Sequence, residues 1–284
     1  MTDPAPSMQA SYRHCESEVR EADRDRYIAS LFAPADRRPH LHALYAFDRE
    51  IALVPHRVHE ALAGEMRLQW WRDALAGEAR GDAAANPVAA ALIDTVARCG
   101  LPLEPLNGLI DARAHELYEE PFATITACAE YGRQTASAML ALAARVLDPA
   151  AEVGAASDPA GVAAALAGML QNVPQDVARG RLFLPLDVLA RQGVRREELG
   201  AGRTSPQLRA AVAEMVATAR DELAAAARAW DAVAPGARPA FLALATVRPL
   251  LARLARNADP FRPTGLAPWR RQWLIWRAAR RGAF

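Results

Sequence analysis

The sequence contains no lysine, only three cysteines and no long uncharged apolar segment. Cys15, Cys99 and Cys128 are far apart and lack CxxC spacing. This pattern argues against a disulfide framework or a zinc site and fits a reducing compartment. No apolar stretch reaches the roughly 20 residues that span a bilayer, and the first residues show no signal-peptide pattern. We therefore expect a cytoplasmic protein, with attachment to the periphery of the inner membrane as an extension of that prediction.

The charge balance excludes a bulk electrostatic argument for nucleic-acid binding. The 34 basic residues nearly cancel 33 acidic ones, which gives a net charge of +1 over 284 residues. The sequence also contains no G-x-S-x-G, P-loop or G-x-G-x-x-G motif. We expect no nucleic-acid partner.

Helical periodicity dominates the chain, and no alternating strand pattern is evident. The only plausible linker, the alanine-rich segment 148–166, is short, so the sequence predicts a single all-α domain with a flexible start at residues 1–11. The predicted helices are Tyr12–Phe32, Arg38–Glu60, Glu65–Leu75, Pro87–Cys99, Leu103–Tyr118, Ile125–Val146, Gly161–Asp176, Ser205–Trp230, Pro239–Asn257 and Pro268–Arg280.

The stretch 166–187, LAGMLQNVPQDVARGRLFLPLD, reads as a buried helix that runs into a basic turn. Asn172 and Asp176 are four residues apart and share one helical face, where burial costs free energy unless their polar groups are satisfied. Arg179 and Arg181 follow in positions suited to a carboxylate or a phosphate. A helix end whose polar residues face water is the plainer interpretation.

A second stretch, 41–73, combines a core helix with an aromatic helix. Leu44, Phe47, Ile51 and Val54 recur at helical spacing, which by itself predicts a buried face.

Together these stretches resemble the squalene/phytoene synthase family. Its enzymes carry Y-A-F-x-R-x-x-D-D-x-x-D in the first stretch and a D-x-x-x-D helix followed by G-R-x-Y-L-P in the second. The resemblance implies an all-α isoprenoid synthase fold with a central cavity. Positions that match are Tyr45, Ala46, Phe47, Arg49, Gly180, Arg181, Leu182, Leu184 and Pro185, with Phe183 in the tyrosine position and Glu116 where the enzymes often have an aspartate.

The acidic positions of the family motifs do not match. The first motif falls on Ala52, Leu53 and His56, and in the second Asn172 replaces one aspartate while Asp176 remains. The family's enzymes join two prenyl diphosphates head to head, with magnesium held by the aspartates. Because magnesium requires oxygen ligands in near-octahedral geometry, we expect no metal site and no cofactor.

Two prolines support this interpretation. Pro55 and Pro174 fall inside the two motifs, and a proline in a helix removes a hydrogen bond at a cost of about 3 kcal/mol. We therefore expect the i, i+4 geometry to be disrupted at both walls of the cavity.

Four residues remain candidates for binding an anion or a diphosphate headgroup without metal. They are Arg49, Arg179, Arg181 and Tyr45. For the arginines, ordinary salt bridges within the bundle are the alternative interpretation.

One branch of the family, the complex I assembly factor 6-like proteins, shows the same loss of acidic residues. The resemblance implies a non-catalytic assembly factor for respiratory NADH dehydrogenase, with complex I subunits or assembly intermediates as partners. Two alternatives stay open: a divergent prenyl transferase that uses Asp176, Asn172, Glu116 and Mg²⁺, and a protein that binds an isoprenoid or other lipid in the cavity. The residues matched to this branch are Asp23, Tyr27, Leu31, Pro34, Ala43, Leu44, Ala46, Phe47, Glu50, Ile51, Ala52, Gly64, Met66, Arg67, Gln69, Trp70, Trp71, Phe183, Leu184, Pro185 and Asp187.

The C-terminal segment 268–284 is rich in tryptophan and arginine. Trp269, Trp273 and Trp276 share one helical face, with Arg270 and Arg277 beside it. The helix either docks its tryptophans into the bundle or lies at a membrane interface or partner surface.

Overall fold

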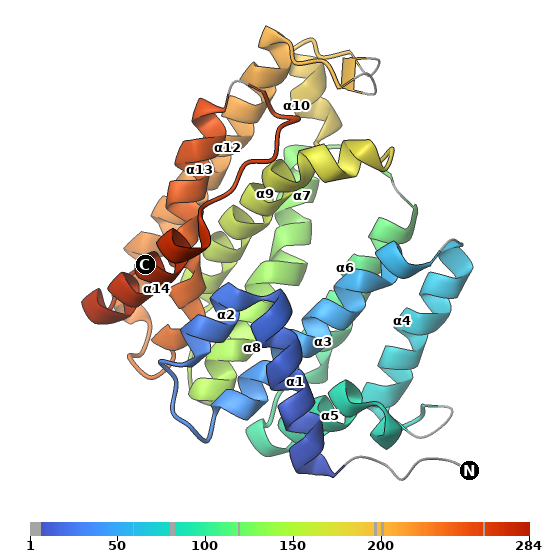
Figure 1. The fold of residues 1–284 in the computed structure, drawn as a ribbon, viewed down its shortest axis with the longest axis vertical. Helices are drawn as coiled ribbons and strands as arrows, with labels where there is room; N and C mark the ends of the chain where they lie inside the picture. The colour runs from blue at the N-terminus through green and yellow to red at the C-terminus, as the bar shows by residue number, and fades with distance from the viewer. Residues whose placement is uncertain are drawn as a thin grey trace.

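The computed structural model describes residues 7–58, 60–79, 83–118, 120–195, 198–199, 202–257 and 259–284. Within these ranges the chain is helical and contains no strand, which confirms the predicted fold class (Figure 1). Its α-helices are α1 (Met8–Ala22), α2 (Arg24–Ser30), α3 (Arg38–Arg57), α4 (Ala61–Ala76), α5 (Pro87–Cys99), α6 (Leu103–His115), α7 (Ile125–Gly132), α8 (Ala138–Leu147), α9 (Gly154–Ala178), α10 (Leu186–Arg191), α12 (Pro206–Arg228), α13 (Val247–Arg256) and α14 (Pro268–Arg281). The 3₁₀ segments are η1 (Ala83–Ala85), η2 (Glu116–Tyr118), η4 (Trp230–Ala232) and η5 (Arg238–Thr246), and η3 (Arg133–Ser137) is π-helical.

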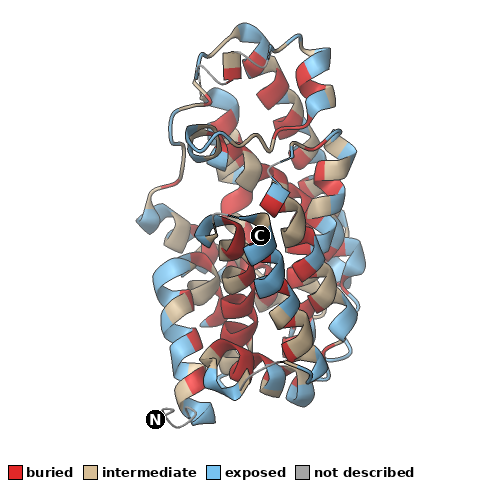
Figure 2. Ribbon diagram, turned by 90° about the vertical axis from the view of Figure 1, so that its right-hand side faces the viewer, coloured by how far each residue is buried: buried red, intermediate tan, exposed pale blue. Residues whose placement is uncertain are grey.

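The helices surround a large hydrophobic core, and a smaller separate cluster of Ala29, Leu242, Ile275 and Ala278 lies between α2, η5 and α14. The long helices α9 and α12 lie side by side, with α7 and α8 packed against α9 (Figure 1). Helices α1, α3 and α5 form a second packed group, and α4 packs on α6 at the outer edge. Buried residues follow the inward faces of the helices and exposed residues follow the outward faces (Figure 2). This division is the amphipathic pattern of a helical bundle.

Helix α3 buries the face that the sequence predicts. Leu44, Phe47 and Ile51 are 0% exposed and Val54 is 4% exposed. Phe47 also packs edge-on against Trp71 of α4, with ring centroids 5.2 Å apart. The recurrence of apolar residues at helical spacing therefore identifies a true core helix.

The start of the chain differs from the prediction in two ways. Residues 1–6 lie outside the described residues, but α1 begins at Met8, so the expected flexible start does not extend to residue 11. The predicted helix 12–32 is broken at Asp23. The Asp23 carboxylate accepts a hydrogen bond from the backbone N–H of Arg26 and begins a new helix, as an N-cap aspartate does.

The alanine-rich segment 148–166 is not a linker. Helix α9 begins at Gly154 and runs through most of it, because alanine favours the helix and the segment packs on the core. The predicted helix 125–146 widens into the π-helical turn η3, where α9 approaches closely. A Cβ on Gly161 would overlap the backbone and hydroxyl of Ser137, so the approach requires glycine.

The expected disruption at Pro55 and Pro174 is wrong. Helix α3 continues through Pro55 to Arg57, and α9 continues through Pro174 to Ala178. The i, i+4 geometry is therefore kept at both motif positions.

Helix α14 has the bounds that the sequence predicts to within one residue, but the docking interpretation of its tryptophans is wrong. It packs through Leu274, Ile275 and Ala278 against η5 and α2, at the side of the bundle (Figure 1). In the part of the chain that the structure describes, no helix combines the length and apolarity needed to cross a membrane.

Candidate functional site

A cavity of about 400 Å³ opens between α3, α6, α7 and α9. Its wall combines charged groups with an apolar part made by Phe122, Met169 and Phe183 and by small residues of η3 and α9. The charged and polar residues that line it are Arg26, Asp48, His56, Arg113, Glu116, Tyr131, Thr135, Asn172 and Asp176.

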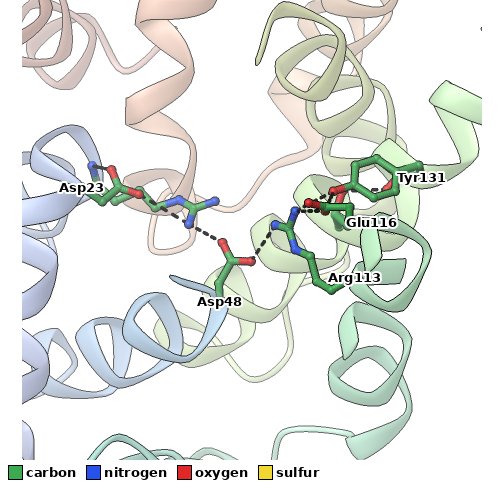
Figure 3. A network of polar contacts seen from close by, with 7 residues as sticks. Asp23, Asp48, Arg113, Glu116 and Tyr131 are labelled. Carbon is green, nitrogen blue, oxygen red and sulfur yellow. Dashed lines mark hydrogen bonds and ion pairs between the residues drawn. The ribbon is translucent and has the colours of Figure 1, made fainter. Parts of the chain in front are cut away.

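One wall of the cavity is a chain of ion pairs between buried carboxylates and partly buried arginines (Figure 3). It is called here the network wall and is made by Arg26, Asp48, Arg113, Glu116 and Tyr131. The Asp48 carboxylate accepts hydrogen bonds from Arg26 at 2.7 Å and from Arg113 at 3.3 Å. Arg113 also donates to Glu116 at 2.8 Å and to the Tyr131 hydroxyl at 2.5 Å. Each of the two arginines thus lies within hydrogen-bonding distance of a carboxylate.

The pKa shifts in the network wall keep the Asp48 carboxylate and the two guanidinium groups charged. Burial alone raises the pKa of Asp48, but Arg26 and Arg113 outweigh burial and hold that pKa below its ordinary value. Burial lowers the pKa of Arg113, yet Tyr131, Glu116 and Asp48 together raise it well above the ordinary value. Burial also raises the pKa of Tyr131, whose hydroxyl donates to Glu116 and stays protonated.

The opposite wall is the C-terminal half of α9, with Gly168, Asn172 and Asp176, and is called here the α9 wall. Asn172 and Asp176 both line the cavity, as their spacing predicts. Burial raises the pKa of Asp176 to about 6, since Arg181 and Arg179 oppose the shift only in part and Glu116 adds to it. This carboxylate therefore titrates near neutral pH.

The end of α9 places two arginines at His56. Gly180 has φ of +74°, Arg181 donates its N–H to the carbonyl of Asp176 at 2.8 Å, and Gly180 donates to Val177 at 3.0 Å. These bonds form a Schellman motif, which needs a residue with positive φ. Both arginines then bond to the His56 Nδ1, from Arg179 at 3.2 Å and from Arg181 at 3.1 Å.

His56 is consequently an acceptor. Burial lowers its pKa first, and the nearby Arg181 and Arg179 lower it further. Arg181 also donates to the carbonyl of Pro55 at 3.0 Å. The predicted anion-binding arginines thus lie beside the cavity, joined to the degenerate first motif.

The other predicted site residues are divided between the cavity and its surroundings. Ala52 lines the cavity but offers no oxygen, and Leu53 is not among its lining residues. Glu116 lines it as predicted. Arg49 lies outside it, 3.7 Å from Glu18 of α1, so the salt-bridge alternative holds for this arginine.

Tyr45 lines a neighbouring cavity of about 250 Å³. The guanidinium carbon of Arg26 lies over the Tyr45 ring, 5.1 Å from its centroid. Arg26, Ala136 and Ala164 line both cavities. Burial raises the pKa of the Tyr45 hydroxyl to about 12. Tyr45 therefore contacts Arg26 of the network wall from the neighbouring cavity.

The donor set does not fit a multi-magnesium site. Asp48 and Glu116 are bonded to arginines, which leaves the Asp176 carboxylate and the Asn172 amide as oxygen ligands in the two motifs. Among the residues that the structure describes, no group of three or more His, Cys, Asp or Glu side chains is placed to hold a metal ion. That the protein works without a cofactor stays a prediction.

The sequence reasoning missed Arg26, Asp48 and Arg113 as cavity residues. Asp48 had a detectable signal, because it precedes Ala52 by four residues and His56 by eight and so shares their helical face. Arg26 and Arg113 had none, since only packing brings their helices to α3.

The helical architecture and its cavity define a protein of the isoprenoid synthase fold. The structure matches the crystal structure of a dehydrosqualene synthase in complex with a ligand, with a TM-score of 0.82 at 18% identity over 98% of this chain and 99% of that chain. The profile of the squalene/phytoene synthase family matches residues 19–277, so the chain belongs to that family.

Two relatives show the range of functions within this similarity. The chain is 30% identical over 262 residues to the NADH dehydrogenase (ubiquinone) complex I assembly factor 6 of Rattus norvegicus. The aligned region covers 91% of this chain and 78% of the rat protein. It is also 25% identical over 289 residues to the 15-cis-phytoene synthase of Synechococcus elongatus. That aligned region covers 93% of this chain and 91% of the phytoene synthase. The predicted resemblance to the family and to its assembly factor 6 branch is confirmed.

Proposed function

We propose that the chain is a non-catalytic member of the squalene/phytoene synthase family that assists the assembly of respiratory NADH dehydrogenase. One observation carries the proposal: the carboxylates of the network wall are paired with partly buried arginines, while the motif positions hold Ala52, His56 and Asn172. The two arginines supply fixed positive charge beside the cavity and occupy the Asp48 and Glu116 carboxylates. The similarity to a complex I assembly factor supports the choice of process.

The first experiment measures pyrophosphate release from farnesyl and geranylgeranyl diphosphate, with and without magnesium, on the purified chain. We expect no release above a control without protein. Magnesium-dependent release that disappears in Asp176→Ala would overturn the non-catalytic proposal and favour a divergent prenyl transferase.

The second experiment deletes the gene and measures NADH dehydrogenase activity and assembly in membranes. We expect both to fall and to be restored by the wild-type chain and equally by Asp176→Ala. Unchanged assembly in the deletion strain would contradict the assembly role, whatever the outcome of the first experiment.

A lipid ligand is the second candidate function, and the apolar part of the cavity favours it. At about 400 Å³ the cavity falls within the range of small-molecule sites, and Phe122, Met169 and Phe183 give it an apolar wall. The test is organic extraction of the purified protein and mass spectrometry of the extract. Replacing Gly168 by Leu would fill the cavity and should abolish any co-purified isoprenoid.

A further inference from the structure

The positive charge of the chain is concentrated at its C-terminal end. Residues 233–284 contain ten arginines and one acidic residue, Asp259, although the whole chain has a net charge of only +1. Helix α14 itself carries five arginines and no acidic residue. The segment 233–284 is therefore strongly basic, while residues 1–232 are acidic on balance.

The same helix exposes three large aromatic side chains. Trp269 is 70% exposed, Trp273 is 47% exposed and Trp276 is 49% exposed. Arg277 lies over the Trp273 ring at 4.5 Å and Arg280 over the Trp276 ring at 5.3 Å, so guanidinium and indole groups share this surface. Exposed aromatic side chains gathered on one helix face mark an interaction surface.

A pocket of about 220 Å³ lies along the arginine edge of α14, between this helix, η5, α13 and α12. Arg248, Arg277 and Arg281 line it above an apolar floor that includes Leu244 and Leu274. No aspartate or glutamate is among its described lining residues, and within the described chain none of the three arginines pairs with a carboxylate. The pocket offers three guanidinium groups to an anion with an apolar attachment.

We propose that this face docks on an anionic phospholipid bilayer, with the tryptophans in the headgroup region and a lipid phosphate held by Arg248, Arg277 and Arg281. Tryptophan prefers the membrane–water interface, and arginines beside it attract anionic lipid. A free phosphate would leave the three exposed tryptophans without a role. A symmetric contact between two copies would oppose two strongly basic surfaces, which repel.

The inference rests on the C-terminal surface and not on the proposed function. It concerns different residues from the cavity, and vesicle binding is measured without NADH dehydrogenase. A result that contradicts one of the two proposals does not contradict the other.

The experiment is co-sedimentation of the full chain with phosphatidylcholine vesicles that contain or lack phosphatidylglycerol, combined with tryptophan emission spectra. We expect binding and a blue shift with phosphatidylglycerol, a fall in binding as salt rises, and little binding to phosphatidylcholine alone. Equal binding to both vesicle types, or none to either, would overturn the proposal.

The decisive variant replaces Arg248, Arg277 and Arg281 by glutamine. We expect its partition onto phosphatidylglycerol vesicles to fall about a hundredfold, since each arginine near the surface contributes to the attraction. The matched control replaces the exposed residues Arg13, Arg67 and Arg145 by glutamine, with the same loss of charge on other helices, and should bind as the wild type does.

A second variant, Trp269→Ala with Trp273→Ala, tests the aromatic face without changing charge. We expect weaker binding and a smaller blue shift, with an unchanged circular dichroism spectrum. An equal loss of vesicle binding in the control variant of Arg13, Arg67 and Arg145 would show that the attraction depends on total charge alone, and it would contradict the docking site. Dimerisation that the tryptophan variant abolishes, without vesicle binding, would assign the face to a second copy instead.

Discussion

Two walls of the same cavity shift the pKa of a carboxyl group in opposite directions, that of the buried Asp48 and that of the half-buried Asp176. In the network wall, Asp48 lies between Arg26 and Arg113, and its pKa falls below the ordinary value despite burial. In the α9 wall, Asp176 has the arginines only at a distance, and burial raises its pKa to about 6. Asp48 therefore stays charged because two guanidinium groups bond to it directly, although it is more deeply buried than Asp176.

The largest expected effect comes from breaking the network wall. Asp48→Ala removes the carboxylate that Arg26 and Arg113 share, although Arg26 keeps Asp23 at 3.5 Å and Arg113 keeps Glu116 at 2.8 Å. Breaking such a partly buried pair costs about 3 kcal/mol, the low end of the range for buried ion pairs. We expect the free energy of unfolding, measured with urea, to fall by that amount.

The control for Asp48 is Asp111→Ala, which removes an exposed carboxylate paired with Arg72, where Asp111 is 65% exposed. We expect it to cost less than about 1 kcal/mol, because exposed pairs are screened by water. Similar losses in the two variants would show that the network wall is no more important to stability than a surface ion pair.

The next largest effect on stability is expected where α9 packs closely against η3, a contact that fixes the position of the α9 wall. Gly161→Ala places a Cβ against the backbone of Ser137 in η3, and overpacking of this kind costs about 1–3 kcal/mol. Gly168→Ala, seven residues further along the same helix, meets nothing within 4 Å and should be neutral or stabilise by up to about 1 kcal/mol.

Thermal unfolding of the two glycine variants measures this difference. If Gly161→Ala is as stable as Gly168→Ala, the close approach of α9 to η3 is not what fixes the α9 wall.

The smallest effect is pH-dependent and opposite in sign to that of Asp48. The pKa of Asp176 rises from the ordinary 3.8 to about 6 on folding, so its stabilising contribution is complete below pH 3.8 and is lost as pH rises through 6. Asp176→Asn should therefore stabilise the protein at pH 8 by about 1 kcal/mol, once the effect of the pKa shift is reduced for solvent screening of this half-buried carboxylate, and it should have little effect near pH 4.

Urea unfolding at a series of pH values checks this prediction, with the exposed Glu152→Gln as the charge-matched control. For Asp48 the sign is reversed, because its pKa is lowered on folding: its contribution is present above pH 3.8 and is lost as pH falls below that value. Destabilisation by Asp176→Asn at pH 8 would contradict the contrast between the two walls.

Much of the architecture was predictable because it depends on local periodicity. Helix α5 begins and ends at the predicted residues, where Asn86 accepts hydrogen bonds from two backbone N–H groups and Gly100 adopts a positive φ. The prediction was wrong where tertiary contacts override local signals. Pro174 stays within a helix that the bundle holds on both sides, and the alanine-rich start of α9 is ordered by packing.

The candidate site was predictable only in part. The i, i+4 spacing placed Asn172 and Asp176 on the cavity side correctly, because a helix fixes that relation by itself. For Arg49 the sequence left an anion site and a salt bridge open. One step along α3 from Asp48 turns its side chain toward Glu18 of α1, where it lies 3.7 Å from the carboxylate.

The helical class, the buried face of α3 and the absence of carboxylates at Ala52, Leu53 and His56 follow from the amino-acid sequence alone. Which charged groups meet depends on how the helices pack. Asp48 is 22 residues from Arg26 and 65 from Arg113, and it meets them because α2 and α6 both pack on α3. Burial and charge partners are properties of the packed bundle, so the charge state of each cavity carboxylate is set there.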